Sequence, residues 1–349
     1  MSIVLVTGSC GLVGSESVKF FIKKGYEVVG IDNNQRKSFF GKEGDITPIR
    51  KELEKLKKYN HLNIDIRDKN LTTKIFKKYK RNIKLIIHAA AQPSHEWAKN
   101  FQIIDFEINA KATLSLLENT KNFCPDATFI FMSTNKVYGD NPNKLKLIEK
   151  KTRWEISKKE KFYQGINEKM SIDNNTHSFF GVSKTYADLI VQEYGKNIGL
   201  NCVCFRAGCI TGPNHAGAKL HGFLSYMVRT SIEKKKYTII GYKGKQVRDN
   251  IHSLDLTNCF WEFFKKPKKG EIYNVGGGRF SNCSVLEGLM MIEDICKIKI
   301  KKNYLSVNRI GDHIWYISNM KKFKTHYPKW KQKYTTKKII NELVEYSKL

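Results

Sequence analysis

The feature that most constrains the fold is a glycine-spaced turn close to the N-terminus. Residues 3–6 form a short, wholly apolar run, typical of a strand that is covered on both faces. Gly8, Gly11 and Gly14 follow at three-residue spacing, and a helical pattern begins directly after them. In such a strand–turn–helix unit the first glycine allows a tight turn, the second lets the backbone approach a pyrophosphate, and the third lets the helix lie close to the strand. Because the N–H groups at the helix start would face the phosphates, the pattern predicts a dinucleotide site.

An acidic residue at the end of the second apolar run narrows the choice of dinucleotide. The run 27–31 is followed by Asp32, which lies 18 residues after Gly14. A carboxylate at this place hydrogen-bonds ribose hydroxyls and repels a 2′-phosphate, which favours NAD over NADP. Arg36 and Lys37 lie nearby and weaken that preference.

Further apolar runs predict that strands and helices continue to alternate. Alternation of this kind is typical of a parallel sheet with helices on both faces. We therefore predict an α/β fold, with a Rossmann-type doubly wound parallel sheet and a smaller C-terminal substrate-binding domain. The segments expected to form or end strands are 3–6, 27–31, 63–68, 85–91, 128–132 and 202–206.

The predicted organisation has two parts. Residues 1–205 would form the NAD-binding domain, with an insertion at 141–176. Residues 206–349 would mainly form the substrate-binding domain, with some segments returning to the first. The segment 208–222 is rich in Gly and His, and a polar, flexible loop beside a cofactor fold indicates substrate binding. The stretch 336–346 is predicted to be an amphipathic helix.

The composition suggests a competing interpretation, a nucleic-acid-binding protein. The chain has 62 Lys+Arg and 33 Asp+Glu, which give a formal net charge of +29. A basic surface of this size could attract nucleic acid. Only ten of the 62 are Arg, however, and the Lys residues occur as short runs along the whole length. Arg is the residue that makes bidentate hydrogen bonds to phosphates and to guanine edges. We therefore favour a solvated, Lys-rich surface and expect no nucleic-acid partner.

Nothing in the sequence indicates a membrane span or an export signal. No window approaches 18 consecutive apolar residues, and the N-terminus enters a strand pattern without a basic leader. Eight Cys without paired spacing fit reduced thiols, which predicts a cytoplasmic protein. We interpret Cys202 and Cys204 as core residues on one strand face, and we expect no metal site.

Several short motifs occur in a fixed order along the chain. They are Thr7 to Gly14, Asp65 to Asp68, His88 to Ala91, Asn109, Ser133 to Gly139, Ser183-Lys184, and Gly241 to Asp249. Together they resemble the extended short-chain dehydrogenase/reductase family of NAD-dependent nucleotide-sugar epimerases and dehydratases, over nearly the whole chain. Within it, the chain looks most like the CDP-paratose (CDP-tyvelose) 2-epimerases. The resemblance implies an isomerase of carbohydrate and lipopolysaccharide biosynthesis, which binds a nucleotide sugar (a CDP-sugar favoured) and forms a homo-oligomer.

The resemblance also implies roles for individual residues. Thr134 and Lys184 would be the catalytic residues, with the Thr134 hydroxyl on the sugar oxygen that becomes a carbonyl. Arg248 and Arg309 would grip the nucleotide pyrophosphate, because planar guanidinium groups suit phosphate oxygens. The residues implied in cofactor binding are Gly8, Gly11, Gly14, Asp32, Asn33, Asp65, Ile66, Ala89, Ala90, Asn109 and Lys184, and those implied in substrate binding are Thr134, Asn135, His215, Arg248 and Arg309.

Two departures from the family pattern shape the functional hypothesis. Dehydratases of this family have Asp-Glu directly after the catalytic hydroxyl, but here Asn135-Lys136 follow, which disfavours 4,6-dehydration. The family's Tyr-x-x-x-Lys signature is altered to Phe180 to Lys184, and Phe has no ionisable group. The nearby candidates for a different base are Tyr163, His177, Tyr186, Cys209 and His215.

Three interpretations of this altered signature remain open. In the first, Lys184 binds the nicotinamide ribose and another group is the base. In the second, Lys184 is itself the base, with a pKa lowered by burial and by the positive nicotinamide ring. In the third, the chain binds NAD and a nucleotide sugar without turnover. The leading hypothesis is epimerisation at C2 of a CDP-sugar through a transient 2-keto intermediate, and the alternatives are UDP-sugar 4-epimerisation and binding without catalysis.

Overall fold

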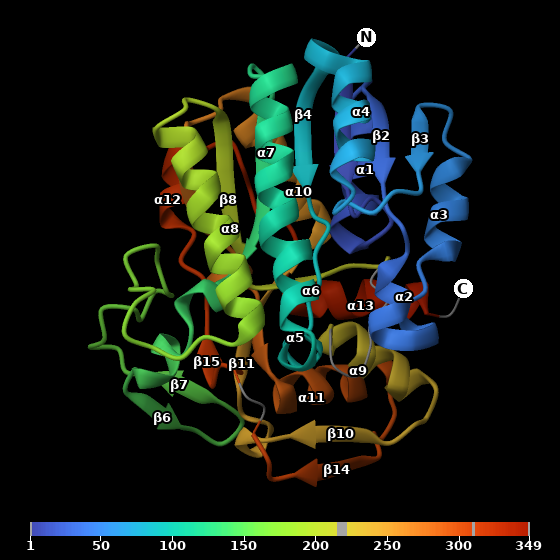
Figure 1. Ribbon diagram of the computed structural model, residues 1–349. Coiled ribbons are helices and arrows are strands. Elements are labelled where there is room, and N and C mark those ends of the chain that lie inside the picture. Colours follow the sequence, from blue (N-terminus) through green and yellow to red (C-terminus); the bar gives the residue numbers. More distant parts are fainter. Residues whose placement is uncertain (1, 215–221, 309–310, 348–349) are drawn as a thin grey trace. The chain divides into compact units, whose positions relative to one another are not determined.

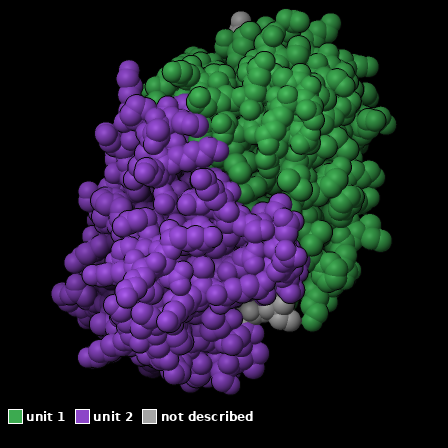
Figure 2. Space-filling view, turned by 90° about the vertical axis from the view of Figure 1, so that its left-hand side faces the viewer, with its two compact units in different colours: residues 1–137, 179–206, 257–273 green, residues 138–178, 207–256, 274–349 purple. Residues whose placement is uncertain are grey.

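A computed structural model describes residues 2–214, 222–308 and 311–347. The chain divides into two units, which Figure 2 colours separately. The first comprises residues 1–137, 179–206 and 257–273, and the second comprises residues 138–178, 207–256 and 274–349. The segment 141–176, expected as an insertion of the NAD-binding domain, thus falls in the second unit.

Seven strands form one sheet, most of which belongs to the first unit (Figure 1). They are β1 (Ile3–Thr7), β2 (Glu27–Ile31), β3 (Tyr59–Leu62), β4 (Ile83–His88), β5 (Thr128–Thr134), β8 (Asn201–Ala207) and β12 (Glu271–Val275). Their order is β12-β8-β5-β4-β1-β2-β3, and β1 pairs in parallel with both β2 and β4. All five residues of β1 are buried, as its uninterrupted apolar sequence predicts. The strand order reverses direction at β1, and ligands of such sheets bind beyond the carboxyl ends of the strands at this point.

Helices cover both faces of the sheet. The helices of the first unit are α1 (Leu12–Lys23), α2 (Gln35–Phe40), α3 (Thr47–Glu54), α4 (Lys69–Tyr79), α5 (His95–Asn100), α6 (Gln102–Phe106), α7 (Ala112–Phe123), α8 (Phe179–Lys196) and most of α10 (Ser253–Lys265). On one face the core joins Phe76 of α4, Leu116 of α7 and Val191 of α8 to the strands. Elsewhere the Phe21 ring of α1 lies 6.1 Å from the Trp261 ring of α10. The predicted doubly wound α/β fold is therefore confirmed.

The third strand lies earlier than the segment 63–68 suggested. The strand β3 ends at Leu62, and the carboxylates of Asp65 and Asp68, which follow it, bind the local backbone. The Asp65 carboxylate accepts a hydrogen bond from Arg67 N at 2.9 Å. The Asp68 side chain accepts one from Leu71 N at 2.9 Å and thereby caps α4. These local side-chain bonds compete with strand pairing, so the chain leaves the sheet before them.

The second unit combines small sheets with helices. Its core brings Leu224, Leu289 and Ile340 together from three different helices. The predicted C-terminal helix is confirmed at α13 (Thr336–Tyr346), whose N-cap Thr335 accepts a bond from Lys338 N at 3.3 Å. The other elements are β6 (Leu147–Glu149), β7 (Trp154–Ile156), β9 (Cys209–Thr211), α9 (Phe223–Ile232), β10 (Tyr237–Ile240), β11 (Val247–His252), β13 (Asn282–Ser284), α11 (Val285–Cys296), β14 (Lys302–Leu305), β15 (Trp315–Tyr316) and α12 (Lys321–His326).

The structure also bears on the predictions for the two cysteines of β8 and for membrane-spanning segments. Cys202 and Cys204 are fully buried side by side on one face of β8, as expected for core residues. None of the helices in the described part of the chain is long and apolar enough to cross a membrane.

The glycine turn gives the first prediction. A Cβ atom at Gly14 would lie 2.0 Å from the carbonyl oxygen of Gly8, whereas one at Gly11 would meet only that oxygen, at 3.4 Å. We expect Gly14→Ala to lower the free energy of unfolding by about 2–3 kcal/mol, because the backbone must shift to admit the methyl group. The control Gly11→Ala should cost less than about 1 kcal/mol. Urea denaturation of both variants measures this, and equal midpoints for Gly14→Ala and the unmodified chain would contradict it.

Candidate active site

The glycine turn joins three elements at the switch point of the sheet. Gly8 has a φ of +68°, and a Cβ there would lie 2.7 Å from the backbone nitrogen of Ala90, in the loop after β4. That loop is attached to β1 by Ala89 N, which donates to Thr7 O at 3.2 Å. Gly11 is the N-cap residue of α1, and no side chain in the described part of the chain caps this helix end. The first N–H groups of α1 therefore remain available to an anionic ligand.

Asp32 lies at the end of β2, beside the turn. Its carboxylate accepts hydrogen bonds from Cys10 N at 3.0 Å and from Asn34 N at 2.9 Å. Burial raises the pKa of Asp32, and these two backbone N–H groups oppose that effect. The charge of the carboxylate is thus held in place by the backbone that forms the turn.

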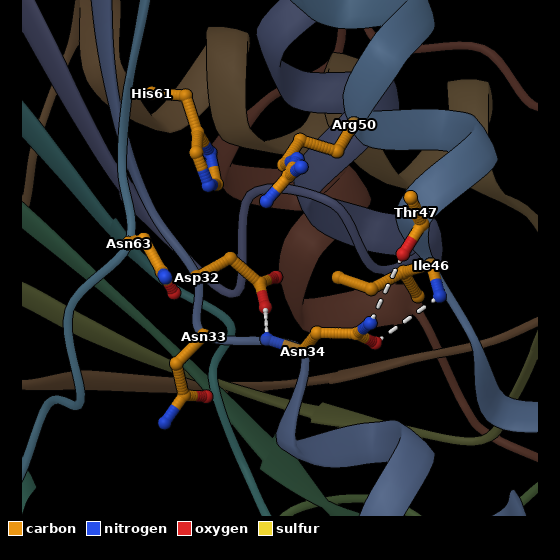
Figure 3. Close-up of a pocket in the computed structure, with 8 residues that line it drawn as sticks. All are labelled: Asp32, Asn33, Asn34, Ile46, Thr47, Arg50, His61 and Asn63. Atoms are coloured by element: carbon orange, nitrogen blue, oxygen red, sulfur yellow. Dashed lines mark hydrogen bonds between the residues drawn. The ribbon is translucent and has the colours of Figure 1, made fainter.

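A small pocket lies next to Asp32 (Figure 3). Figure 3 shows the side chains of Arg50 and His61 converging on the space beside the Asp32 carboxylate. The Nε2 atom of His61 is buried without a hydrogen-bond partner. The pocket therefore combines the Arg50 guanidinium with the Asp32 carboxylate, and a carboxylate accepts hydrogen bonds from hydroxyl groups. Its lining residues are Asp32, Asn33, Asn34, Ile46, Thr47, Arg50, His61 and Asn63.

Asn33 and Asp65 form a second group at the ends of β2 and β3. Asn33 donates a side-chain hydrogen bond to Asp65. The Arg67 guanidinium also binds that carboxylate, with its Nη2 atom 2.6 Å from Oδ2. Although burial raises the pKa of Asp65, the bonds from Arg67 lower it overall. The structure therefore brings Asn33 and Asp65 together, whereas Ile66 belongs to the apolar core of the first unit.

Lys184 is almost completely enclosed, with 3% of its surface exposed. Its Nζ atom donates to the carbonyl oxygen of Met132 at 2.6 Å and lies 4.1 Å from the centre of the Phe131 ring. Burial lowers the pKa of Lys184 to about 8, and the charge of nearby Asp188 limits the decrease. With this pKa the protonated form of the amine predominates at neutral pH, beside a smaller unprotonated fraction.

Thr134 and Asn135 lie where β5 ends. The Thr134 hydroxyl accepts from Lys136 N at 3.2 Å and faces the Asn135 Oδ1 atom at 3.4 Å. This end of β5 is attached to α8, because Ser133 Oγ donates to Asp188 at 2.5 Å. The sequence did not single out Asp188, whose buried carboxylate also binds a guanidinium on β8. Thr134 is thus held close to the part of α8 that carries Lys184.

Phe180, which stands where the family signature has Tyr, lies on α8 together with Lys184. Phe180 and Lys184 lie four residues apart, so they share one face of the helix. Phe180 is only 7% exposed, and the centre of its ring lies 4.9 Å from that of the His95 ring in an edge-to-face arrangement. Tyr186 is 37% exposed and contacts the Phe106 ring, so this candidate base faces away from Lys184. His95 was not among the candidates that the sequence suggested.

Asn109 is the centre of a buried network. It is 1% exposed, its Oδ1 atom accepts from Gln92 N at 3.0 Å, and its Nδ2 atom donates to Asp105 Oδ1 at 3.0 Å. Ser183 Oγ donates to the other Asp105 oxygen at 2.6 Å. Sequence reasoning missed Gln92 and Asp105, and it gave Ser183 no role beyond its place in the Ser183-Lys184 motif. Asp105 and Asn109 are spaced by four residues, which is a helical pairing signal, but Gln92 has no local signal.

The remaining candidates lie in the second unit or outside the described residues. Arg248 donates from Nη2 to Asp312 Oδ1 at 2.5 Å, so its guanidinium is held on β11 by an ion pair. Tyr163, His177 and Cys209 belong to the same unit. His215 and Arg309 lie outside the residues that the structure describes.

Comparison with known proteins identifies the family. The profile of the NAD dependent epimerase/dehydratase family matches residues 4–276. The chain belongs to this family. It is therefore an enzyme of the NAD-dependent epimerase/dehydratase family, and the resemblance seen in the sequence is confirmed.

Individual members of the epimerase/dehydratase family are similar over most or all of their length. A CDP-paratose 2-epimerase of Salmonella typhi is 30% identical, covering 99% of this chain and 98% of the relative. A putative UDP-glucose 4-epimerase of Methanocaldococcus jannaschii is 26% identical, and the match covers 81% of this chain and 79% of the relative. A UDP-glucuronic acid 4-epimerase of Bacillus cereus, solved with UDP-glucuronic acid and NAD, has a TM-score of 0.77 and 25% identity, covering 99% of both chains.

NAD, the cofactor of the epimerase/dehydratase family, fits the residues present. The first turn of α1 has no acidic residue that would repel a pyrophosphate. A Cβ at Gly11 would occupy space in which only Gly8 O comes within 4 Å, so the backbone is open to a ligand there. The Asp32 carboxylate and the pocket beside it complete a polar path along the strand ends.

The lowered pKa of Lys184 gives the second prediction. Its folded pKa of about 8 lies below the ordinary value of 10.5, so from pH 8 to 10.5 the unfolded chain binds a proton that the folded chain does not. Stability must then rise with pH across this interval. The variant Lys184→Met has no such group. Between pH 7 and pH 10 the free energy of unfolding of the unmodified protein should therefore rise by roughly 2–3 kcal/mol relative to that of the variant.

Urea denaturation of both proteins at several pH values measures this difference. The control Lys111→Met, at an exposed position, should give a difference that does not change with pH. A pH-independent difference for Lys184→Met would show that the amine titrates normally.

Proposed function

We propose that this enzyme inverts the configuration at C2 of a CDP-sugar of the paratose/tyvelose type. The observation that carries the proposal is the similarity to a CDP-paratose 2-epimerase, at 30% identity and with almost complete coverage of both chains. Asn135 and Lys136 support it, because they replace the acid pair that a 4,6-dehydratase needs to eliminate water. Epimerisation needs no such elimination.

A second candidate is epimerisation at C4 of a UDP-sugar. It is favoured by the similarity to a putative UDP-glucose 4-epimerase, although at lower identity and coverage. Both reactions begin with the oxidation of one carbinol carbon, so the site residues would serve either. The position of the sugar relative to the cofactor decides between them.

The cofactor would lie along the ends of β1, β2 and β4. The turn at Gly8, Gly11 and Gly14 would hold the pyrophosphate on the N-terminus of α1. Asp32 and Asn33 would hold the adenosine ribose, Asp65 and Ile66 the adenine, and Ala89 and Ala90 would line the path between them. When bound, NAD supplies reversible uptake of a hydride from the sugar carbon.

The chain's own residues would position the sugar and manage its charge. The Thr134 hydroxyl would donate to the sugar oxygen, and Asn135 would bind a neighbouring hydroxyl. Lys184, as an enclosed ammonium, would stabilise negative charge that develops on that oxygen as the hydride leaves. The proton of the sugar hydroxyl passes either to the unprotonated fraction of Lys184 or to another group, because Phe180 cannot accept it.

Nuclear magnetic resonance tests the reaction directly. We expect the protein, incubated with NAD and a CDP-sugar in deuterated water, to invert C2 without incorporating solvent deuterium at carbon. Retention of the original hydrogen follows from internal hydride return. Inversion of a UDP-sugar at C4 alone would select the second candidate, and carbon-bound deuterium or no conversion of any sugar would overturn both.

Arg248 gives a separate prediction about the nucleotide. A guanidinium binds phosphate oxygens through two parallel bonds, which a lysine amine cannot reproduce. We expect Arg248→Lys to weaken CDP binding about tenfold and to leave NAD binding unchanged, as measured by calorimetry. The control Arg81→Lys, at an exposed ion pair, should change neither affinity. Unchanged CDP binding in Arg248→Lys would exclude it from the nucleotide site.

A further inference from the structure

The face of α8 that carries Lys184 has no phenol, because Phe180 occupies the place of the family tyrosine. Phe180 cannot ionise, and the Lys184 Nζ atom already donates to Met132 O at 2.6 Å. Oxidation of a sugar carbinol releases one proton from the hydroxyl as the hydride leaves the carbon. The family tyrosine would accept that proton from the position of Phe180, so a group close to Phe180 is the first place to look for its replacement.

His95 is the titratable side chain in ring contact with Phe180. The two ring centres are 4.9 Å apart, with an angle of 63° between the planes. His95 is partly exposed and opens α5, directly after the loop that leaves β4 at the switch point of the sheet. An imidazole nitrogen can accept a proton and return it, and histidine is the side chain most often used for this purpose in catalysis.

The backbone next to His95 is held by one side chain. Gln92 Nε2 donates to the carbonyl oxygen of Ser94 at 2.9 Å, and Ser94 N donates to Gln92 Oε1. The Ser94 hydroxyl in turn accepts from Trp97 N at 3.2 Å and caps α5. Both backbone polar groups of the preceding residue are thus fixed, which determines the direction in which His95 leaves the loop.

The same network attaches this loop to α8. The second hydrogen of Gln92 Nε2 is donated to Asp105 Oδ1 at 2.7 Å, and Ser183 Oγ donates to Asp105 Oδ2 at 2.6 Å. Ser183 directly precedes Lys184. One buried carboxylate therefore anchors both the loop that carries His95 and the helix that carries Phe180 and Lys184. This common anchor connects the two segments that carry His95 and Phe180, and all of these residues belong to the first unit.

We propose that His95 replaces the missing tyrosine as the group that accepts the sugar hydroxyl proton and later returns it. The inference rests on the proposed function and deepens it. In the forward step the O–H bond breaks, its proton moves to an unprotonated imidazole nitrogen, the C–H bond breaks with transfer of a hydride to the cofactor, and the carbonyl forms. In the return step the hydride goes back to the opposite face of the carbon, and the imidazolium gives its proton to the oxygen. No other reactant is needed.

Replacement of His95 and restoration of the tyrosine test this role together. We expect His95→Gln to lower kcat about a hundredfold or more, the usual contribution of a proton-transferring side chain. NAD affinity, measured by calorimetry, should remain within about twofold, because the imidazole is assigned to the sugar. The double variant His95→Gln/Phe180→Tyr should have a kcat at least tenfold higher than that of His95→Gln, because its phenol would lie on the same face of α8 as Lys184. The matched control His326→Gln, in the second unit, should leave kcat unchanged.

Each outcome separates this inference from the proposed function. If the unmodified protein is active and His95→Gln keeps its kcat within about threefold, His95 is not the acceptor and the proposed function stands. If the double variant is as inactive as His95→Gln while both bind NAD normally, His95 has a structural role instead. If the unmodified protein converts no sugar but Phe180→Tyr does, the chain lacks an acceptor and both proposals fail. If His95→Gln does not fold, His95→Asn is measured in the same way.

Discussion

The close approach of the Gly8 backbone to Gly14 and Ala90 is the constraint on which the first unit depends. A Cβ would lie 2.0 Å from Gly8 O if placed on Gly14, and 2.7 Å from Ala90 N if placed on Gly8. Because neither contact leaves room for a side chain, β1, α1 and the end of β4 can meet only through glycine. Their meeting sets the carboxyl ends of β1 and β4 side by side. The loops that follow these strands, including the one that carries His95, start from this fixed place.

Buried charge then determines how α8 lies against the sheet. Asp188 accepts bonds from Arg206 at 2.7 and 3.1 Å and from Ser133 at 2.5 Å, and Asp105 accepts one from Ser183 at 2.6 Å. Removing charges from water is costly, and such groups are tolerated only where several partners replace the lost hydration. A helix shifted along its axis would leave both carboxylates without partners. The polar network therefore selects one position of α8, and with it the position of Lys184.

The sequence predicted the parts of the site whose signals are local. The glycine turn, Asp32 and Lys184 could be found because each belongs to a short pattern of fixed spacing. The link from Gln92 through Asp105 to Ser183 could not be predicted, because only the packing of α6 and α8 brings residues about 80 positions apart into contact. Helical periodicity alone could have placed the Tyr186 side chain away from Lys184, since residues two positions apart face different sides of a helix.

Phe180 shows which part of the chemistry such a fold constrains most. Hydride transfer depends on the position of the cofactor, which the backbone of the turn and the carboxylate of Asp32 would determine. A proton, by contrast, can be taken up by any group of suitable pKa within reach of the hydroxyl. A buried phenylalanine removes one such group, but its ring makes an edge-to-face contact with His95, a kind of contact that stabilises by roughly 0.5–1.5 kcal/mol. Phenylalanine at this position thus gives up an ionisable group and makes a ring contact with His95. The proton route can therefore change while the cofactor site stays the same, which is how one fold supports different site chemistries.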